Sequence, residues 1–165
     1  MRLAIEEAKC AFENGEIPVG AVAVYRGEIV GRGHNGKETQ CDPTAHAEII
    51  ALREAARTQG GWRLLDVTLY CTLEPCPMCA GAMIQARLPR LIYALDDPKA
   101  GAAGSVIDLL HHPQLNHQVQ VTRGLLSAQV QDLIGAFFCA LREGTIPRYS
   151  EAWKHRRLAE KHESV

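Results

Sequence analysis

The chain has 165 residues, of which 47% are hydrophobic and 22% are charged, with a formal net charge of −1. This length fits one domain with a sizeable core, and the composition argues against disordered, fibrous and disulfide-dependent proteins. The near-zero charge excludes a general attraction to nucleic acid, so such a partner would need a local patch. Residues 142–165 are mildly basic, with six Lys or Arg against four Asp or Glu.

The sequence contains no candidate membrane span, because no apolar run approaches the roughly 18 residues that would suggest one. Acidic residues near the N-terminus, such as Glu6 and Glu7, interrupt the apolar region that a signal peptide needs. We therefore expect a cytoplasmic protein in which residues 1–165 form a single domain. Residues 143–165 are predicted to be a C-terminal helical tail.

The first half of the chain predicts a helix, a β-hairpin and a second helix. Apolar residues recur at helical spacing until Gly15, and Gly27 stands in a tight turn between two short apolar runs. Gly60 and Gly61 end the second helical pattern. The predicted helices cover residues 3–12 and 45–58, and the predicted strands cover residues 19–25 and 28–33.

The second half predicts three more strands between helices. The strands cover residues 67–73, 90–95 and 117–124, and the helices cover residues 76–87, 126–144 and 148–162. Gly144 and Pro147 mark the end of the long helix before the tail. Strands that alternate with helices imply a mixed, partly parallel sheet with helices on both faces. The expected fold class is α/β, a three-layer α/β/α sandwich around a mixed five-stranded sheet.

Two groups of possible metal ligands lie at the starts of predicted helices. His46 opens one helix, and Cys76 and Cys79 open another directly after a strand. Zinc binds thiolate sulfur and imidazole nitrogen, and a Cys-x-x-Cys pair places two sulfurs on one side of a first helical turn. The alternatives are a redox pair and a structural site with four cysteines. The other four cysteines are scattered singly, which is typical of small buried residues.

Three ligands leave one tetrahedral position for water, which is the arrangement of catalytic zinc and points to hydrolysis. Glu48 lies two residues after His46. In a regular helix these two side chains would point about 200° apart. At a helix start the geometry is relaxed enough for both to reach one pocket, so Glu48 is the candidate proton carrier.

The motif His46-Ala47-Glu48 followed by Pro75-Cys76-Pro77-Met78-Cys79 resembles the signature of zinc-dependent nucleobase deaminases. The wider sequence resembles the bacterial tRNA adenosine deaminases over residues 1–142. This resemblance rests on PVGAV, Asn35, DPTAHAEI, TLEPCPMCAGAMI, DPKAGAAGS, HHPQLNH and the closing FF.

The resemblance implies a cytidine deaminase-like fold and hydrolysis of the wobble adenosine in an arginine tRNA anticodon to inosine, releasing ammonia. It implies one Zn²⁺ per subunit, held by His46, Cys76 and Cys79, with Glu48 as the catalytic proton shuttle. It also implies a homodimer that binds the tRNA anticodon stem-loop, with no membrane association. The residues implied to bind the substrate are Asn35, Ala47, Asp97 and Lys99.

Two other functions stay open on the sequence alone. The deaminase signature reports the chemistry and not the substrate, so a free-base or nucleoside deaminase such as a guanine deaminase is one alternative. A zinc-stabilised RNA-binding module without catalysis is the other, although a purely structural metal would not need Glu48. The tail departs from the family's pattern at residues 144–147, so it either contacts RNA or packs on the body of the protein.

Overall fold

The computed structural model describes residues 1–146, and it contains four helices and one sheet within that range. The elements are α1 (Arg2–Glu13), β1 (Gly20–Tyr25), β2 (Glu28–His34), α2 (Ala47–Thr58), β3 (Val67–Leu73), α3 (Pro77–Gln85), β4 (Arg90–Leu95), β5 (Gln120–Arg123) and α4 (Ser127–Glu143). Each predicted element up to residue 144 is thus confirmed in type and order. The helix predicted for residues 148–162 lies outside the described range.

The sheet is mixed, as the sequence predicts. Its strands lie in the order β2-β1-β3-β4-β5, with β1 antiparallel to both of its neighbours. The pairs β3–β4 and β4–β5 are parallel. The hairpin between β1 and β2 turns at Arg26 and Gly27, whose φ angles of +49° and +88° match the primed turns that follow strand twist.

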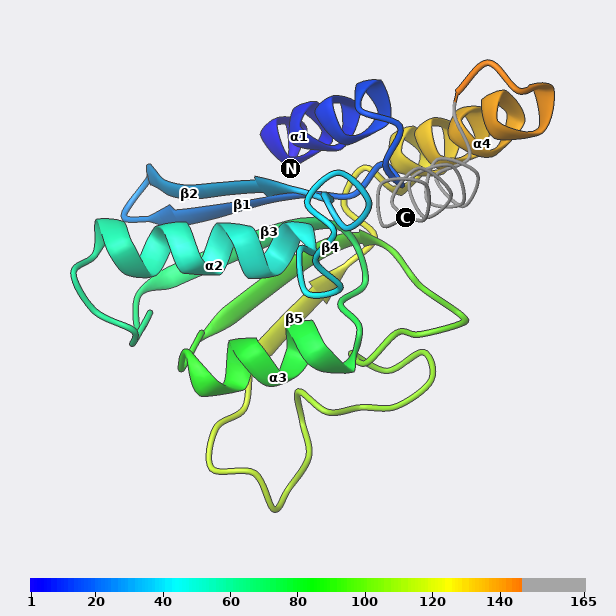
Figure 1. Cartoon of the computed structure of the whole chain (residues 1–165). Coiled ribbons are helices and arrows are strands. Elements are labelled where there is room, and N and C mark those ends of the chain that lie inside the picture. Colours follow the sequence, from blue (N-terminus) through cyan, green and yellow to red (C-terminus); the bar gives the residue numbers. More distant parts are fainter. Residues whose placement is uncertain (147–165) are drawn as a thin grey trace, which may run out of the picture.

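Helices cover both faces of the sheet, which confirms the three-layer α/β/α sandwich (Figure 1). The helices α1 and α4 lie on one face, and α2 and α3 lie on the other. The larger core cluster lies under α2 and α3, and a smaller one that includes Ile5, Ala94 and Val130 lies under α1 and α4. Within residues 1–146, no helix is both long and apolar enough to cross a membrane.

Glycines in β2 let α2 approach the sheet closely. A Cβ added at Gly33 would overlap the carbonyl oxygen of Ala47 and lie 2.8 Å from the backbone nitrogen of Ala51. Gly31 faces the next turn of the helix in the same way, against the carbonyl oxygen of Ala51. Because Ala47 is the first residue of α2, this contact sets where the helix begins relative to the sheet.

The strand β5 is shorter than the predicted range of residues 117–124. A ring nitrogen of His117 lies 2.7 Å from the carbonyl oxygen of Leu88, and the backbone N–H of Val119 donates to Leu110. These contacts hold residues 117–119 in the connecting loop. Pairing with β4 therefore begins only at Gln120.

Candidate metal centre and active site

Two helix starts meet at one edge of the sheet. His46 is the N-cap of α2, and Cys76 is the N-cap of α3, and both have extended backbone angles. Cys76 follows closely on β3, and Cys79 lies in the first turn of α3. The close packing of α2 on β2 and the parallel strands under α3 bring these three residues together although 30 residues separate His46 from Cys76.

The three side chains have the spacing of a tetrahedral zinc site. The Nδ1 atom of His46 lies 3.6 Å from the Sγ atoms of both Cys76 and Cys79, and the two sulfurs are 3.7 Å apart. Zinc–sulfur bonds of about 2.3 Å and zinc–nitrogen bonds of about 2.0–2.1 Å in a tetrahedron give edges of about 3.6 and 3.8 Å. The residues present therefore fit a zinc ion. Residues 1–146 contain no second group of three such ligands.

The pKa shifts make Cys76 the thiolate of the group, while Cys79 and His46 hold their protons more tightly. The hydrogen bond between the two sulfurs lowers the pKa of Cys76 and raises the pKa of Cys79, whose burial adds to the increase. The hydrogen bond to Cys76 raises the pKa of His46, although burial opposes this. Metal binding requires both thiols as thiolates, so an ion would displace the remaining thiol proton.

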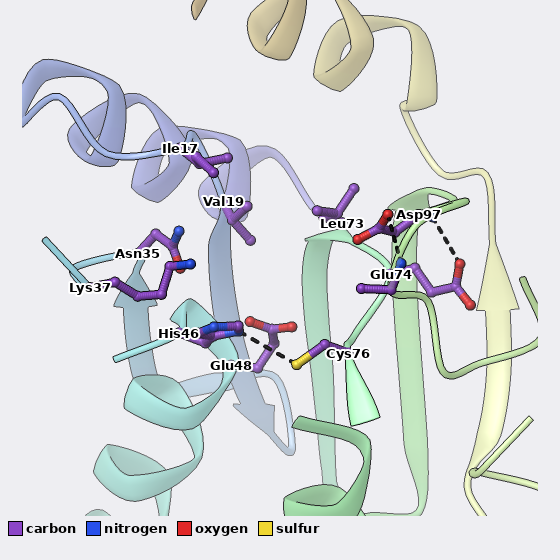
Figure 2. Close-up of a pocket in the computed structure, with 11 residues that line it drawn as sticks. Ile17, Val19, Asn35, Lys37, His46, Glu48, Leu73, Glu74, Cys76 and Asp97 are labelled. Carbon is purple, nitrogen blue, oxygen red and sulfur yellow. Dashed lines mark hydrogen bonds between the residues drawn. The ribbon is translucent and has the colours of Figure 1, made fainter. Parts of the chain in front are cut away.

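Glu48 lies beside this group, in the first turn of α2, and its side chain is only 3% exposed. Since the helix begins at Ala47, the extended backbone of His46 removes the 200° separation expected in a regular helix. Figure 2 shows the carboxylate directed into the same pocket as the His46 ring and the Cys76 sulfur. Burial raises the pKa of Glu48 to about 7.

A pocket of about 210 Å³ opens above these groups. This is smaller than the roughly 300–1,000 Å³ of sites for drug-sized ligands, so it suits a group the size of one nucleobase. Its lining residues are Ile17, Val19, Asn35, Lys37, His46, Glu48, Leu73, Glu74, Cys76, Asp97 and Ala100. Apolar side chains thus form walls for a flat ring, and Figure 2 shows Asn35 and Lys37 on one side of the pocket and Glu74 and Asp97 on the other.

The structure brings Asn35 and Asp97 to this pocket but not the side chains of Ala47 and Lys99. The side-chain amide of Asn35 makes no hydrogen bond to any other residue in the described part of the chain, and it faces the pocket (Figure 2). Asp97 accepts hydrogen bonds from the backbone N–H groups of Lys99 and Ala100. Ala47 is fully buried, and Lys99 lines a neighbouring apolar hollow that includes Phe138.

Sequence reasoning missed two polar residues of the pocket, Lys37 and Glu74. Glu74 carried a usable signal, since it is an acid at the end of an apolar strand, two residues before Cys76. Lys37 carried none beyond its place two residues after Asn35. A lysine in a loop is too common to indicate a site.

Comparison with known proteins identifies deaminases as relatives of this chain. Residues 1–142 match the family of MafB19-like deaminases. The tRNA-specific adenosine deaminase of Bacillus subtilis is 46% identical over 143 residues, which cover 87% of this chain and 89% of that relative.

Two solved structures place the fold among the deaminases. One, from work on A-to-I editing by tRNA:A34 deaminases at the wobble position of transfer RNA, has a TM-score of 0.78 and 41% identity, and covers 81% of this chain and 96% of that chain. A guanine deaminase from Bacillus subtilis has a TM-score of 0.57 and 34% identity, and the match covers 86% of this chain and 90% of that chain. The chain therefore has the cytidine deaminase-like fold and belongs to the family of tRNA-specific adenosine deaminases.

Proposed function

We propose that this protein hydrolyses the wobble adenosine of an arginine tRNA anticodon to inosine and releases ammonia. One observation carries the proposal: three donor atoms at the spacing of tetrahedral zinc lie beside a buried carboxylate in a pocket of nucleobase size. The relatives and the solved structure named above add the tRNA substrate. Such a substrate places the activity in the cytoplasm.

His46, Cys76 and Cys79 would hold one zinc ion per subunit. The ion supplies Lewis acidity that brings the pKa of water toward 7, which makes water a nucleophile at neutral pH. The protein's part is to fix the three donors and to leave the pocket side of the centre open to the substrate. Cys79 is fully buried, and Cys76 and His46 are half-buried, so the open side faces the pocket.

Glu48 would move the protons. Its carboxylate takes a proton from the attacking water and delivers it to purine N1 as the C6–O bond forms. It then takes the proton of the new C6 hydroxyl and passes it to the amino nitrogen, which leaves as ammonia as the C6–N bond breaks and the C6 carbonyl forms. A carboxyl with a pKa near 7 holds and releases a proton with little cost at neutral pH, and burial provides that value here.

Asn35 and Asp97 would bind the substrate. The Asn35 amide offers both a donor and an acceptor to the edge of the base, and it has no competing partner in the described part of the chain. Asp97 is an acid, so it suits a ribose hydroxyl better than a phosphate, and a 2′-hydroxyl contact would distinguish RNA from DNA. Lys99 would contact the RNA backbone outside the pocket. Ala47 would contribute its backbone beside the metal centre.

Deamination of a free base is the second candidate, because a guanine deaminase of similar fold is 34% identical to this chain. An assay of the zinc-loaded protein with an arginine-tRNA anticodon stem-loop, free guanine, adenosine and cytidine separates the candidates. We expect inosine in the stem-loop alone. Ammonia released only from a free compound would contradict the tRNA substrate, and binding of the stem-loop with no ammonia from any compound would indicate a binding module.

We further propose a homodimer of single-domain subunits. The helix α3 supports this, since its partly exposed residues include Met78, Gly81 and Ala82, which form an apolar outer face. All described elements belong to one sheet and its covering helices, which supports one domain. Light scattering should give twice the mass of the chain for the wild type and the mass of one chain for Ala82→Glu. A monomeric wild type at micromolar concentration would contradict the proposal.

A further inference from the structure

Two carboxylates that take no part in the proposed proton transfer are buried near the pocket. Glu16 is 1% exposed and Glu74 is 2% exposed. Neither forms an ion pair with a cationic group in residues 1–146. A buried carboxylate is costly unless hydrogen bonds satisfy it, so the identity of its donors shows what it holds in place.

Glu74 holds the loop of residues 97–105. One of its oxygens accepts the backbone N–H groups of Ala103 and Ser105, at 2.9 and 3.1 Å. The other accepts the backbone N–H of Asp97 at 2.9 Å and the hydroxyl of Ser105. Four donors from both ends of one loop thus converge on a single carboxylate (Figure 2 shows its bond to Asp97).

Gly101 lies in this loop at a point where only a glycine fits against the carboxylate. A Cβ added there would overlap the carboxylate of Glu74 and would lie 2.6 Å from the carbonyl oxygen of Asp97. The loop therefore wraps around Glu74 as closely as backbone allows. This packing keeps Asp97 at the pocket wall.

Glu16 holds the loop on the other side of the pocket in the same way. A single oxygen accepts the backbone N–H groups of Glu38 and Thr39, both at 2.8 Å, and the Thr39 hydroxyl at 3.0 Å. This loop carries Asn35 and Lys37, and Figure 2 shows these two residues across the pocket from Asp97.

We propose that Glu16 and Glu74 are paired positioning residues, which fix the two loops of residues 35–41 and 97–105 as opposite walls of the substrate pocket. The proposal rests on the proposed function for its substrate. Hydrogen bonds to an ionised carboxylate are about twice as strong as neutral ones, and a loop ordered before binding loses less entropy when RNA arrives. The pair therefore sets the affinity for the substrate more than the rate of the chemical step.

The bonding patterns of the two carboxylates predict different responses to amide substitution. Glu74 uses both oxygens, so Glu74→Gln places an NH₂ group against N–H or O–H donors and releases one end of the loop. Among residues 1–146, the donors to Glu16 use one oxygen, so the amide oxygen of Glu16→Gln can replace it. Glu16→Ala removes the acceptor altogether and is the matched variant for the loop of residues 35–41.

Two further variants approach the same contact from the loop. Gly101→Ala displaces the loop while Glu74 stays intact, and Ser105→Ala removes only the side-chain hydroxyl from the four donors. These variants keep the test valid if Glu74→Gln does not fold. Gly135→Ala is the control, because it lies in α4 and a Cβ there would meet nothing within 4 Å.

The test combines stem-loop kinetics with backbone hydrogen exchange of the zinc-loaded protein. We expect Glu74→Gln and Gly101→Ala to raise KM about tenfold, with kcat within about threefold, and Ser105→Ala to raise KM less; a tenfold change corresponds to about 1.4 kcal/mol. Exchange should accelerate in residues 97–105 and not in residues 35–41. In Glu16→Ala, exchange should accelerate in residues 35–41 and not in residues 97–105. Glu16→Gln and Gly135→Ala should resemble the wild type in both measurements.

A merely structural role would give a different result. In that case kcat would fall with the folded fraction measured by circular dichroism, KM would not change, and exchange would accelerate throughout the chain; this result would overturn the proposal. The exchange measurement needs no substrate. If the wild type does not act on the stem-loop, the proposed function fails, but unchanged exchange of residues 97–105 in Glu74→Gln and Gly101→Ala would separately overturn the positioning role.

Discussion

At the level of single residues, the position of Glu48 combines burial with closeness to the three candidate metal ligands. Glu48 is 3% exposed and shares a pocket with the His46 ring. The substitution Glu48→Gln keeps the shape of the side chain, but the amide cannot accept a proton as the carboxylate does. We expect the variant to retain zinc, measured by metal analysis, and to lose about 10²–10⁴-fold in kcat, which is the usual contribution of general acid–base catalysis.

The control for this variant is Glu28→Gln, which changes an exposed carboxylate in β2. It should deaminate the stem-loop at the wild-type rate. If Glu48→Gln kept more than a tenth of the wild-type turnover, the proton-shuttle role would have to be assigned to another group.

The sulfur atoms of Cys76 and Cys79 make a second prediction at this scale. Each sulfur lies 3.6 Å from the Nδ1 atom of His46, and the described residues contain no other group of three possible ligands. Cys76→Ala and Cys79→Ala should therefore lose both zinc and activity. Cys10→Ala, which removes an exposed thiol of α1, should keep full occupancy. Zinc retained in stoichiometric amount by either of the first two variants would refute the ligands proposed here.

At the level of elements, the contact between β2 and α2 determines where the candidate metal ligand His46 lies. Gly33 lies against the first turn of α2, where His46 and Glu48 are positioned. Gly33→Ala forces a methyl group into the carbonyl oxygen of Ala47, so the start of the helix must move.

We expect this overpacking to lower the free energy of unfolding by about 1–3 kcal/mol, measured by guanidinium denaturation. Zinc affinity should also weaken, because the His46 ring moves relative to the two sulfurs. Gly61→Ala has open space around its new Cβ and should change neither quantity. If Gly33→Ala were destabilised but bound zinc with wild-type affinity, the helix contact would not be what positions the metal ligands.

At the scale of the whole molecule, a zinc ion would connect segments that are far apart in the chain. Its donors come from the start of α2, which precedes β3 in the chain, and from the start of α3, which follows it. The native state alone assembles all three donors, so binding adds directly to folding stability.

Removal of zinc by a chelator should therefore lower Tm. A ligand at 1,000 times its Kd stabilises the native state by about 4 kcal/mol. For a chain of this size, each kcal/mol changes Tm by about 2–4 °C, so we expect a decrease of about 10 °C in calorimetry. Glu48→Gln, which keeps the ligands, should show the same decrease. Equal Tm values with and without chelator would mean that no metal is bound at this site.

Local sequence patterns were sufficient to predict the secondary structure and the kind of chemistry. Helical spacing, glycine stops and the turn at Gly27 are local effects, and each predicted element through residue 144 is present. The ligand types were equally local, since Cys-x-x-Cys has one geometry in a first helical turn. The resemblance in residues 1–142 supplied the substrate, and the deaminase relatives confirm the family.

Which side chains share the pocket depends on the tertiary fold. Two predicted substrate residues, Ala47 and Lys99, have side chains outside it, whereas Lys37 and Glu74 line it. The distances between the ends of β2, β3 and β4 depend on strand order and helix packing, which no local pattern encodes. For the same reason Glu74 could not be recognised as an anchor, because its four donors come from residues 23 to 31 positions further along the chain.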